Sequence, residues 1–191
     1  MSELTLTAGS AEQEYEQAPC GEHRAVLVGI IKSENEETKF GPKDVLYFYF
    51  ELAKEMSDGR PFLVRKKFNH SRNEKSNLYK FLTKWRGQPF KNGESVDLGK
   101  LLNTGCILEI EPWTPEGSDK TLHLVDRARN LDKGEWIKPS GGFDRERIAT
   151  RIEEKKAEFA GQQPEPVAAK PAPKPEKPGR QEWTDEDDVP F

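Results

Sequence analysis

The sequence holds few residues of the kinds that build disulfides, metal sites or membrane spans. Its 191 residues include two cysteines and three histidines, which are scattered without the spacing of metal ligands. No apolar run approaches the length that crosses a bilayer, and no signal peptide opens the chain. We therefore expect a reduced, cytoplasmic protein with no disulfide, no metal and no other cofactor.

Catalytic motifs are missing as well. The chain has no phosphate-binding loop, no nucleophile elbow and no close pair of carboxylates in a suitable setting. These are the patterns by which many hydrolases and nucleotide-dependent enzymes are recognised. We expect a binding protein without catalytic residues rather than an enzyme.

Charge is small in sum but uneven in distribution. The formal net charge is −4, yet residues 60–91 hold ten Lys or Arg residues and one acid, Glu74. Residues 1–20 hold four glutamates and no base. A basic middle between acidic ends indicates that any nucleic-acid surface is confined to the middle of the chain.

Five segments of β-type composition predict strands. The clearest is 45–54, where strict alternation places Leu46, Phe48, Phe50 and Leu52 on one face. It places Tyr47, Tyr49 and Glu51 on the other face. The five expected strands are residues 22–33, 45–54, 61–69, 105–113 and 121–125.

A change of period between the third and fourth strands predicts a helix over residues 73–86. Its apolar stripe ends on Trp85, which favours core packing for that ring over base stacking, and Gly87 stops the helix. Three strands, a helix and two strands are typical of the OB-fold, an all-β, five-stranded Greek-key barrel. An SH3-like barrel is the alternative, although it would not need so long a helix.

Composition divides the chain into five parts. They are a flexible acidic N-terminus (1–20), an OB-fold nucleic-acid-binding domain (21–138), a charged helix (139–160), a linker rich in Pro, Ala and Lys (161–180) and an acidic tip (181–191). The apolar stripe of the charged helix is thin, with Ile148 and Ile152 one turn apart, which predicts a surface helix outside the core. The linker is expected to be an extended, semi-rigid spacer.

The outward face of the second and third strands carries the main binding candidates. An OB-fold binds single strands by stacking bases on aromatic rings while basic side chains follow the phosphates. Tyr47 and Tyr49 fit the stacking role, although ordinary cross-strand packing explains them equally well. Arg65, Lys66 and Lys67 are either phosphate ligands or a solvated charge run, and their position beside the tyrosines favours nucleic acid.

Two loops add weaker candidates. Trp113 lies next to the turn between the last two strands, where OB-folds often contact ligands, so it is either a base-stacking residue or a strand-end core residue. Phe40, with Lys39 and Lys43, occupies the first long loop and is a similar candidate.

The chain ends on a compact ligand made of Asp185, Glu186, Asp187, Asp188, Val189, Pro190 and Phe191. Phe191 could fill an apolar pocket while an arginine clamps its carboxylate and a basic rim receives the aspartates. These residues resemble the acidic tip of bacterial single-stranded DNA-binding proteins, with Glu186 where Asp is common and Val189 where Ile or Leu is common. The resemblance implies that the tip docks replication, recombination or repair enzymes.

A second resemblance covers roughly residues 22–130. The stretch Lys39-Phe-Gly-Pro-Lys-Asp44 and the stretch Ser76-Asn-Leu-Tyr-Lys-Phe-Leu-Thr-Lys-Trp-Arg-Gly87 resemble a group of phage-borne and related bacterial proteins of replication modules. That resemblance implies an OB-fold, and for a phage-encoded protein a location in the host cytoplasm or nucleoid. The barrel lacks the usual sequence of the bacterial binding proteins, so a homotetramer is not implied and a homo-oligomer stays open.

Residues and resemblances together predict a single-stranded DNA-binding protein. It would coat single strands without sequence preference during replication, recombination or repair, and it would recruit partner enzymes through the tip. Two alternatives stay open. One is an adaptor whose barrel binds protein and whose tip attaches it to a replication enzyme; the other is an RNA-binding barrel, because stacking and phosphate contacts do not distinguish the sugars.

Overall fold

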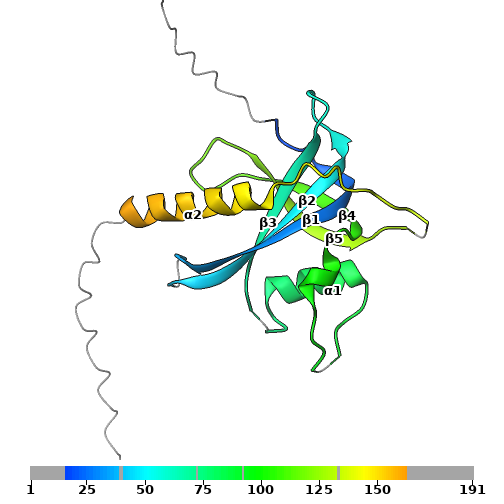
Figure 1. The fold of residues 1–191 in the computed structure, drawn as a ribbon, viewed down its shortest axis with the longest axis horizontal. Coiled ribbons are helices and arrows are strands. Elements are labelled where there is room, and N and C mark those ends of the chain that lie inside the picture. The colour runs from blue at the N-terminus through cyan, green and yellow to red at the C-terminus, as the bar shows by residue number, and fades with distance from the viewer. Residues whose placement is uncertain (1–15, 39–40, 72, 92, 133, 163–191) are drawn as a thin grey trace, which may run out of the picture.

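The computed structural model describes residues 16–38, 41–71, 73–91, 93–132 and 134–162. Along the chain these form β1 (Gly21–Glu36), β2 (Lys43–Glu55), β3 (Pro61–Asn69), α1 (Asn77–Arg86), the short 3-10 helix η1 (Leu98–Leu101), β4 (Gly105–Trp113), β5 (Leu122–Asn130) and α2 (Arg145–Gln162) (Figure 1). The acidic tip at 185–191, and Lys39 and Phe40 of the first loop, lie outside the described residues.

All five strands belong to one antiparallel sheet, in the order β3-β2-β1-β4-β5. The central strand β1 pairs with β2 on one side and with β4 on the other, and the β1–β2 ribbon projects beyond the rest of the sheet (Figure 1). The predicted five antiparallel strands, with a helix between the third and fourth, are confirmed. The expected closure into a barrel is not formed, because the described residues of the edge strands β3 and β5 share no ladder.

Local signals in the sequence account for most element boundaries. β3 and β4 begin and end at the predicted residues. Helix α1 begins at Asn77 because the Ser76 hydroxyl accepts a hydrogen bond from the Tyr79 amide (3.2 Å), and it ends where Gly87 adopts φ +74°. β5 continues to Asn130, beyond the predicted end at Val125, because its ladder with β4 runs on to the pair Cys106 and Asn130.

The inner face of the sheet packs on α1. The four inward residues of β2 meet the predicted stripe of α1, which consists of Leu78, Phe81, Leu82 and Trp85. The Phe50 and Trp85 ring centroids are 5.8 Å apart, and those of Phe68 and Phe81 are 4.9 Å apart. This aromatic layer is the main apolar core, and Trp85 is confirmed as a core residue.

The outer face of β1 and β2 is covered by α2, which forms a second apolar cluster there. Ile31, Val45, Tyr47, Tyr49 and Ile152 are buried in this cluster. The expectation that the charged helix stays outside the core is therefore wrong. The thin apolar stripe of α2 is sufficient for this packing, because only one narrow face of the helix is buried against the sheet.

The segment that leads into α2 is held by two contacts. The buried carboxylate of Glu51 accepts hydrogen bonds from the amide (2.7 Å) and the hydroxyl (2.9 Å) of Ser140. The ring of Phe143 lies 5.4 Å from that of Tyr49 and occupies the space above Gly29, where an added Cβ would stand 2.2 Å from Phe143. The absence of a side chain at Gly29 thus leaves room for Phe143, in the segment that leads into α2.

The described part of the chain contains the α-helices α1 and α2 and both cysteines. Neither helix there has both the length and the apolar character needed to cross a bilayer. In the same ranges, no three His, Cys, Asp or Glu side chains gather as a metal site. Cys106 is buried within β4, where burial raises the pKa of its thiol, and Cys20 is exposed.

Candidate nucleic-acid interface

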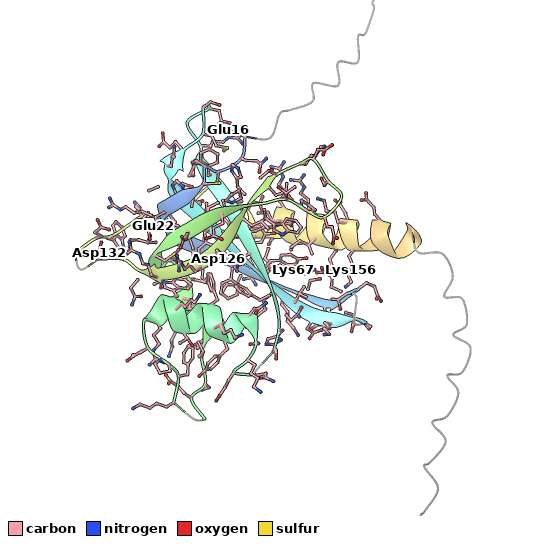
Figure 2. The ribbon with its side chains drawn as sticks, turned by 180° about the vertical axis from the view of Figure 1, so that it is seen from behind. Glu16, Glu22, Lys67, Asp126, Asp132 and Lys156 are labelled. Carbon is pink, nitrogen blue, oxygen red and sulfur yellow. The ribbon has the colours of Figure 1, made fainter. Side chains whose placement is uncertain are left out.

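A groove of about 990 Å³ lies between β3, α1, β5 and α2. Its cationic lining residues are Arg65, Lys66, Lys67, Lys80, Lys84, Lys155 and Lys156. Three carboxylates line it as well, those of Glu36, Glu37 and Asp126. Lys67, Lys156 and Asp126 are labelled in Figure 2. Seven cations against three anions make this a positive groove in a protein whose net charge is negative.

The cations reach the groove from three separate elements. On β3 the side chains alternate, so Lys66 points to the inner face and its neighbours Arg65 and Lys67 to the outer face. On α1, Lys80 and Lys84 lie one turn apart, on the side opposite the buried stripe. On α2, Lys155 and Lys156 follow the buried Ile152 by three and four residues, which brings them to the edge of the face that packs on the sheet.

Lys66 is the most enclosed of these cations. Its ammonium lies 5.9 Å from the Phe68 ring centroid and 5.7 Å from that of Phe81, and it donates a hydrogen bond to the main-chain carbonyl of Val125 on β5. Burial lowers the pKa of Lys66, and the nearby Asp126 partly opposes that shift. The groove floor at this point is aromatic and the charge above it is fixed in place.

Tyr47 and Tyr49 do not lie on an exposed face of the sheet, as the sequence predicts. They are 7% and 5% exposed, because α2 and Phe143 pack over the face on which they lie. The prediction of an exposed tyrosine pair is wrong, and ordinary cross-strand packing does not by itself explain their burial, because the cover comes from α2 and Phe143. Burial raises the phenol pKa of both residues, and the neighbouring Arg65 opposes that shift.

Tyr47 instead takes part in a polar cluster at the groove wall. Its hydroxyl donates to one carboxylate oxygen of Glu36 (2.6 Å), and the ammonium of Lys67 donates to the other. Burial lowers the pKa of Lys67. The guanidinium of Arg65 and the ammonium of Lys67 lie 5.6 Å and 5.7 Å from the centroid of the Tyr47 ring. The predicted neighbours Tyr47, Arg65 and Lys67 are thus brought together, with Glu36 as a member that the sequence did not reveal.

The remaining predicted site residues lie at the ends of strands. Trp113 is 50% exposed, so the alternative of a strand-end core residue does not hold for it, and its base-stacking role stays a prediction. It faces Leu122 across the β4–β5 pair, and the exposed Leu124 two residues further on also lines the groove. Lys43 lies opposite Glu36 in the β1–β2 ladder.

Sequence reasoning missed the lysines of α2 as site residues. The available signal was their spacing, because any helix that buries Ile152 brings Lys155 and Lys156 to the rim of the buried face. This spacing has no meaning for a helix expected on the surface outside the core; it becomes a signal only when the helix packs on the sheet. Lys80 and Lys84 belong to the basic stretch at 60–91, but the sequence alone does not show that they form one wall of a groove.

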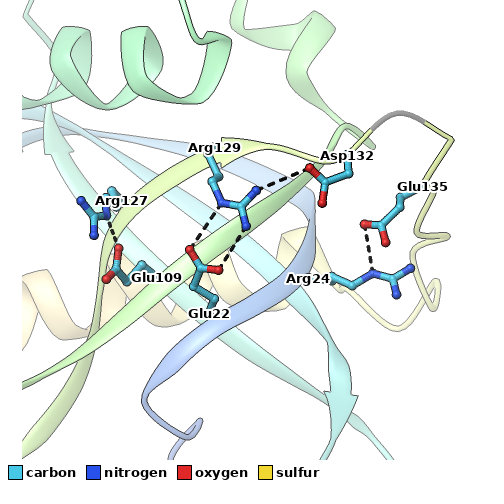
Figure 3. A network of polar contacts seen from close by, with 7 residues as sticks. All are labelled: Glu22, Arg24, Glu109, Arg127, Arg129, Asp132 and Glu135. Carbon is cyan, nitrogen blue, oxygen red and sulfur yellow. Dashed lines mark hydrogen bonds and ion pairs between the residues drawn. The ribbon is translucent and has the colours of Figure 1, made fainter.

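A second charged region on β1, β4 and β5 contrasts with the groove (Figure 3). Arg129 bonds to Glu22 (3.1 Å) and lies 3.8 Å from Asp132, and Arg127 pairs with Glu109. Beside them, Arg24 pairs with Glu135 (3.5 Å). Each arginine drawn there has a carboxylate partner, so this region presents compensated charge rather than a positive field.

Comparison with models of known protein families finds no match, and comparison with curated proteins finds none either. The chemistry of the groove is therefore the basis for a function.

Proposed function

We propose that the protein binds single-stranded DNA without sequence preference in the groove between α1, β3 and α2. The observation that carries the proposal is the gathering of seven cations from three elements around a floor that includes Phe68, Phe81 and Leu124. Phosphate neutralisation by Lys and Arg supplies sequence-independent affinity, and apolar or aromatic surface receives unstacked bases. Uncharged hydrogen-bonding side chains, which would read base edges, are few along the groove.

The proposal includes an OB-fold. The strand order β3-β2-β1-β4-β5, with a helix between β3 and β4, is the order of an OB barrel opened between β3 and β5. The hydrogen bond from Lys66 to Val125 supports it, because it connects the two strands whose pairing would close such a barrel. In that fold the face of strands two and three and the adjacent loops bind single strands. Here the groove lies beside that face, because α2 covers its tyrosines.

Separate residues serve phosphates and bases in this account. The lysines of α1 and α2 and the outward Arg65 and Lys67 contact phosphates on either side of the strand. Leu124 and the exposed ring of Trp113 continue the apolar floor toward the β4–β5 turn, where bases stack. Tyr47 does not stack; it holds Glu36 in position.

The biological role rests on the resemblances in the sequence. We infer that the protein coats single strands in the cytoplasm during replication, recombination or repair, as part of a phage or related replication module. The acidic tip would dock partner enzymes at the end of its Pro-rich linker. The likeness of the tip to that of bacterial single-stranded DNA-binding proteins favours DNA over RNA.

The groove is tested with a charge-reversed pair on one of its walls. The full chain is titrated into a labelled single strand of mixed sequence, as wild type and as the double variant Lys80→Glu/Lys84→Glu. We expect affinity to fall at least tenfold, about the effect of losing two phosphate contacts. The control is Lys54→Glu/Lys100→Glu, which makes the same charge change at exposed lysines outside the groove. Equal losses in both variants would contradict a localised groove.

A protein-binding adaptor is the second candidate, and one observation favours it. Trp113, Leu122 and Leu124 form an exposed apolar strip at the β4–β5 turn, of the kind that partner proteins cover. An adaptor would not bind single strands in a salt-dependent way, so the same titration distinguishes the two candidates.

A further inference from the structure

The end of β1 carries an irregularity that turns a carboxylate into the groove. Ser33 pairs with Val45 and Glu36 pairs with Lys43, so β1 has one residue more than β2 between these two pairs. This extra residue is a β-bulge, and within it Asn35 adopts φ +52°, in the left-handed region that asparagine enters more readily than most residues other than glycine. The amide of Asn35 donates to the Asp44 carboxylate (3.2 Å), which helps to hold the bulge.

The bulge decides which face receives Glu36. Side chains alternate along a regular strand. If β1 ran on from Ser33 without a bulge, Glu36, three residues later, would lie on the face opposite Ser33 and Tyr47. With the bulge it lies on the same face as Tyr47. A bulge that re-aims a side chain beside a binding site is a recurring feature of sheets, and backbone strain persists where surrounding contacts enforce it.

Glu36 then interacts with two groups of the groove at once. Its carboxylate accepts from the Lys67 ammonium and from the Tyr47 hydroxyl, and its side chain is only 16% exposed. Tyr47 is itself buried beneath α2, so its hydroxyl is a fixed anchor. Among the described residues, Glu36 is the carboxylate of the groove that forms an ion pair with one of its lysines.

We propose that Glu36 is a built-in competitor for Lys67, which a phosphate of the single strand must displace. This inference rests on the proposed function, because it assigns a residue that sets the affinity of the same groove. When a phosphate takes Lys67, Glu36 stays in the groove on its tyrosine anchor and repels the polyanion. The protein therefore binds single strands less tightly than its cations alone would allow, and it releases them more readily to enzymes that act on the strand.

The test compares Glu36→Gln with a matched control in the full chain. Gln has the shape of Glu and still accepts the Tyr47 hydrogen bond, but it does not hold Lys67 by charge or repel phosphate. We expect Glu36→Gln to bind a mixed-sequence single strand about threefold to tenfold more tightly at low salt, the size of one partly screened charge interaction. The dependence of log affinity on log salt becomes steeper by at most about 0.7, the value of one phosphate contact on a single strand, because in the variant no freed carboxylate takes up a cation when phosphate binds Lys67.

Three variants make the outcome specific. Glu22→Gln removes the same charge from the ion pair with Arg129, outside the groove, and is expected to change affinity less than twofold. Lys67→Met weakens binding, and in that background Glu36→Gln gains less than it does alone. Glu36→Ala is a second variant with the same expected gain in affinity if Glu36→Gln does not fold, and thermal unfolding checks each protein.

Each remaining outcome contradicts the inference in a recognisable way. If the wild type binds single strands and Glu36→Gln changes affinity no more than Glu22→Gln does, Glu36 is not a competitor for Lys67. The proposed function is not affected by that result. Wild type that binds no single strand overturns both. Loss of the fold in both Glu36 variants makes Glu36 a structural residue and contradicts the role assigned to it.

Discussion

Lys66 on β3 donates a hydrogen bond to the main-chain carbonyl of Val125 on β5 and so connects the two edge strands of the sheet. The ammonium that makes this link also lies over Phe68 and Phe81, at the floor of the basic groove. One half-buried cation thus contributes both to the shape of the sheet and to the field of the groove.

The enclosure of Lys66 predicts a dependence of stability on pH. Burial lowers the pKa of Lys66, so between that lowered value and the ordinary lysine pKa of about 10.4 the unfolded chain binds more protons than the folded chain. The free energy of unfolding contributed by Lys66 therefore rises with pH across this window. Denaturant unfolding of wild type and Lys66→Met at a series of pH values measures it. We expect the free energy of unfolding of wild type to rise relative to that of Lys66→Met as pH rises. A difference between the two proteins that does not change with pH would show that the ammonium is not desolvated.

The docking of α2 predicts a stability effect at Ile152. This side chain is buried against the outer face of the sheet, so Ile152→Ala is expected to lower the free energy of unfolding by about 2 kcal/mol, the lower end of the range for buried aliphatic truncation. Glu154→Ala, on an exposed position of the same helix, controls for helix propensity. Equal stability of the two variants would place α2 off the sheet.

The packing of Phe143 over Gly29 predicts that substitutions of these two residues have non-additive effects on the free energy of unfolding. Gly29→Ala brings a methyl group into the ring of Phe143 and is expected to cost about 1–3 kcal/mol, the usual cost of overpacking. In a Phe143→Ala background the same methyl group has room, so its cost falls by at least half. Denaturant unfolding of the two single variants and the double variant gives the coupling. Additive costs would mean that Gly29 is required for another reason.

The exposed strip at the β4–β5 turn predicts a base-stacking residue. Trp113→Ala is expected to weaken single-strand binding by about tenfold, within the roughly 1–3 kcal/mol measured for base–aromatic stacking. Trp136→Ala is the control, because Trp136 is 71% exposed but belongs to the segment between β5 and α2 and not to the strip of Trp113, Leu122 and Leu124 that reaches the groove at Leu124. Fluorescence anisotropy with one oligonucleotide compares them. A loss shared by both variants, or by neither, would remove Trp113 from the interface.

Much of the inner layer could be predicted from the sequence, because its signals are local. The alternation in β2 and the stripe of α1 each identify the buried side without knowledge of the partner. The serine and glycine at the two ends of α1 likewise act within one turn.

The outer layer could not be predicted, because its signals are tertiary. The pattern placed Tyr47 and Tyr49 on the correct face, but their exposure depends on α2, which lies about a hundred residues further along the chain. The thin stripe of α2 does not reveal what it packs against. The bulge has only a weak local sign, an asparagine at position 35, which enters the left-handed region more often than most residues. That sign does not show which face receives Glu36.

The most direct test of the central claim is a titration of the full chain with a mixed-sequence single strand, and with the matching duplex, over a series of salt concentrations. Several lysines from α1, β3 and α2 contact phosphate in this account, so affinity for the single strand should fall steeply as salt rises, with a slope of log affinity against log salt of about −0.7 per phosphate contacted. It should also exceed affinity for the duplex at each salt concentration, because only unpaired bases can reach the apolar floor. Affinity that does not change with salt, or binding that does not distinguish the single strand from the duplex, would contradict it.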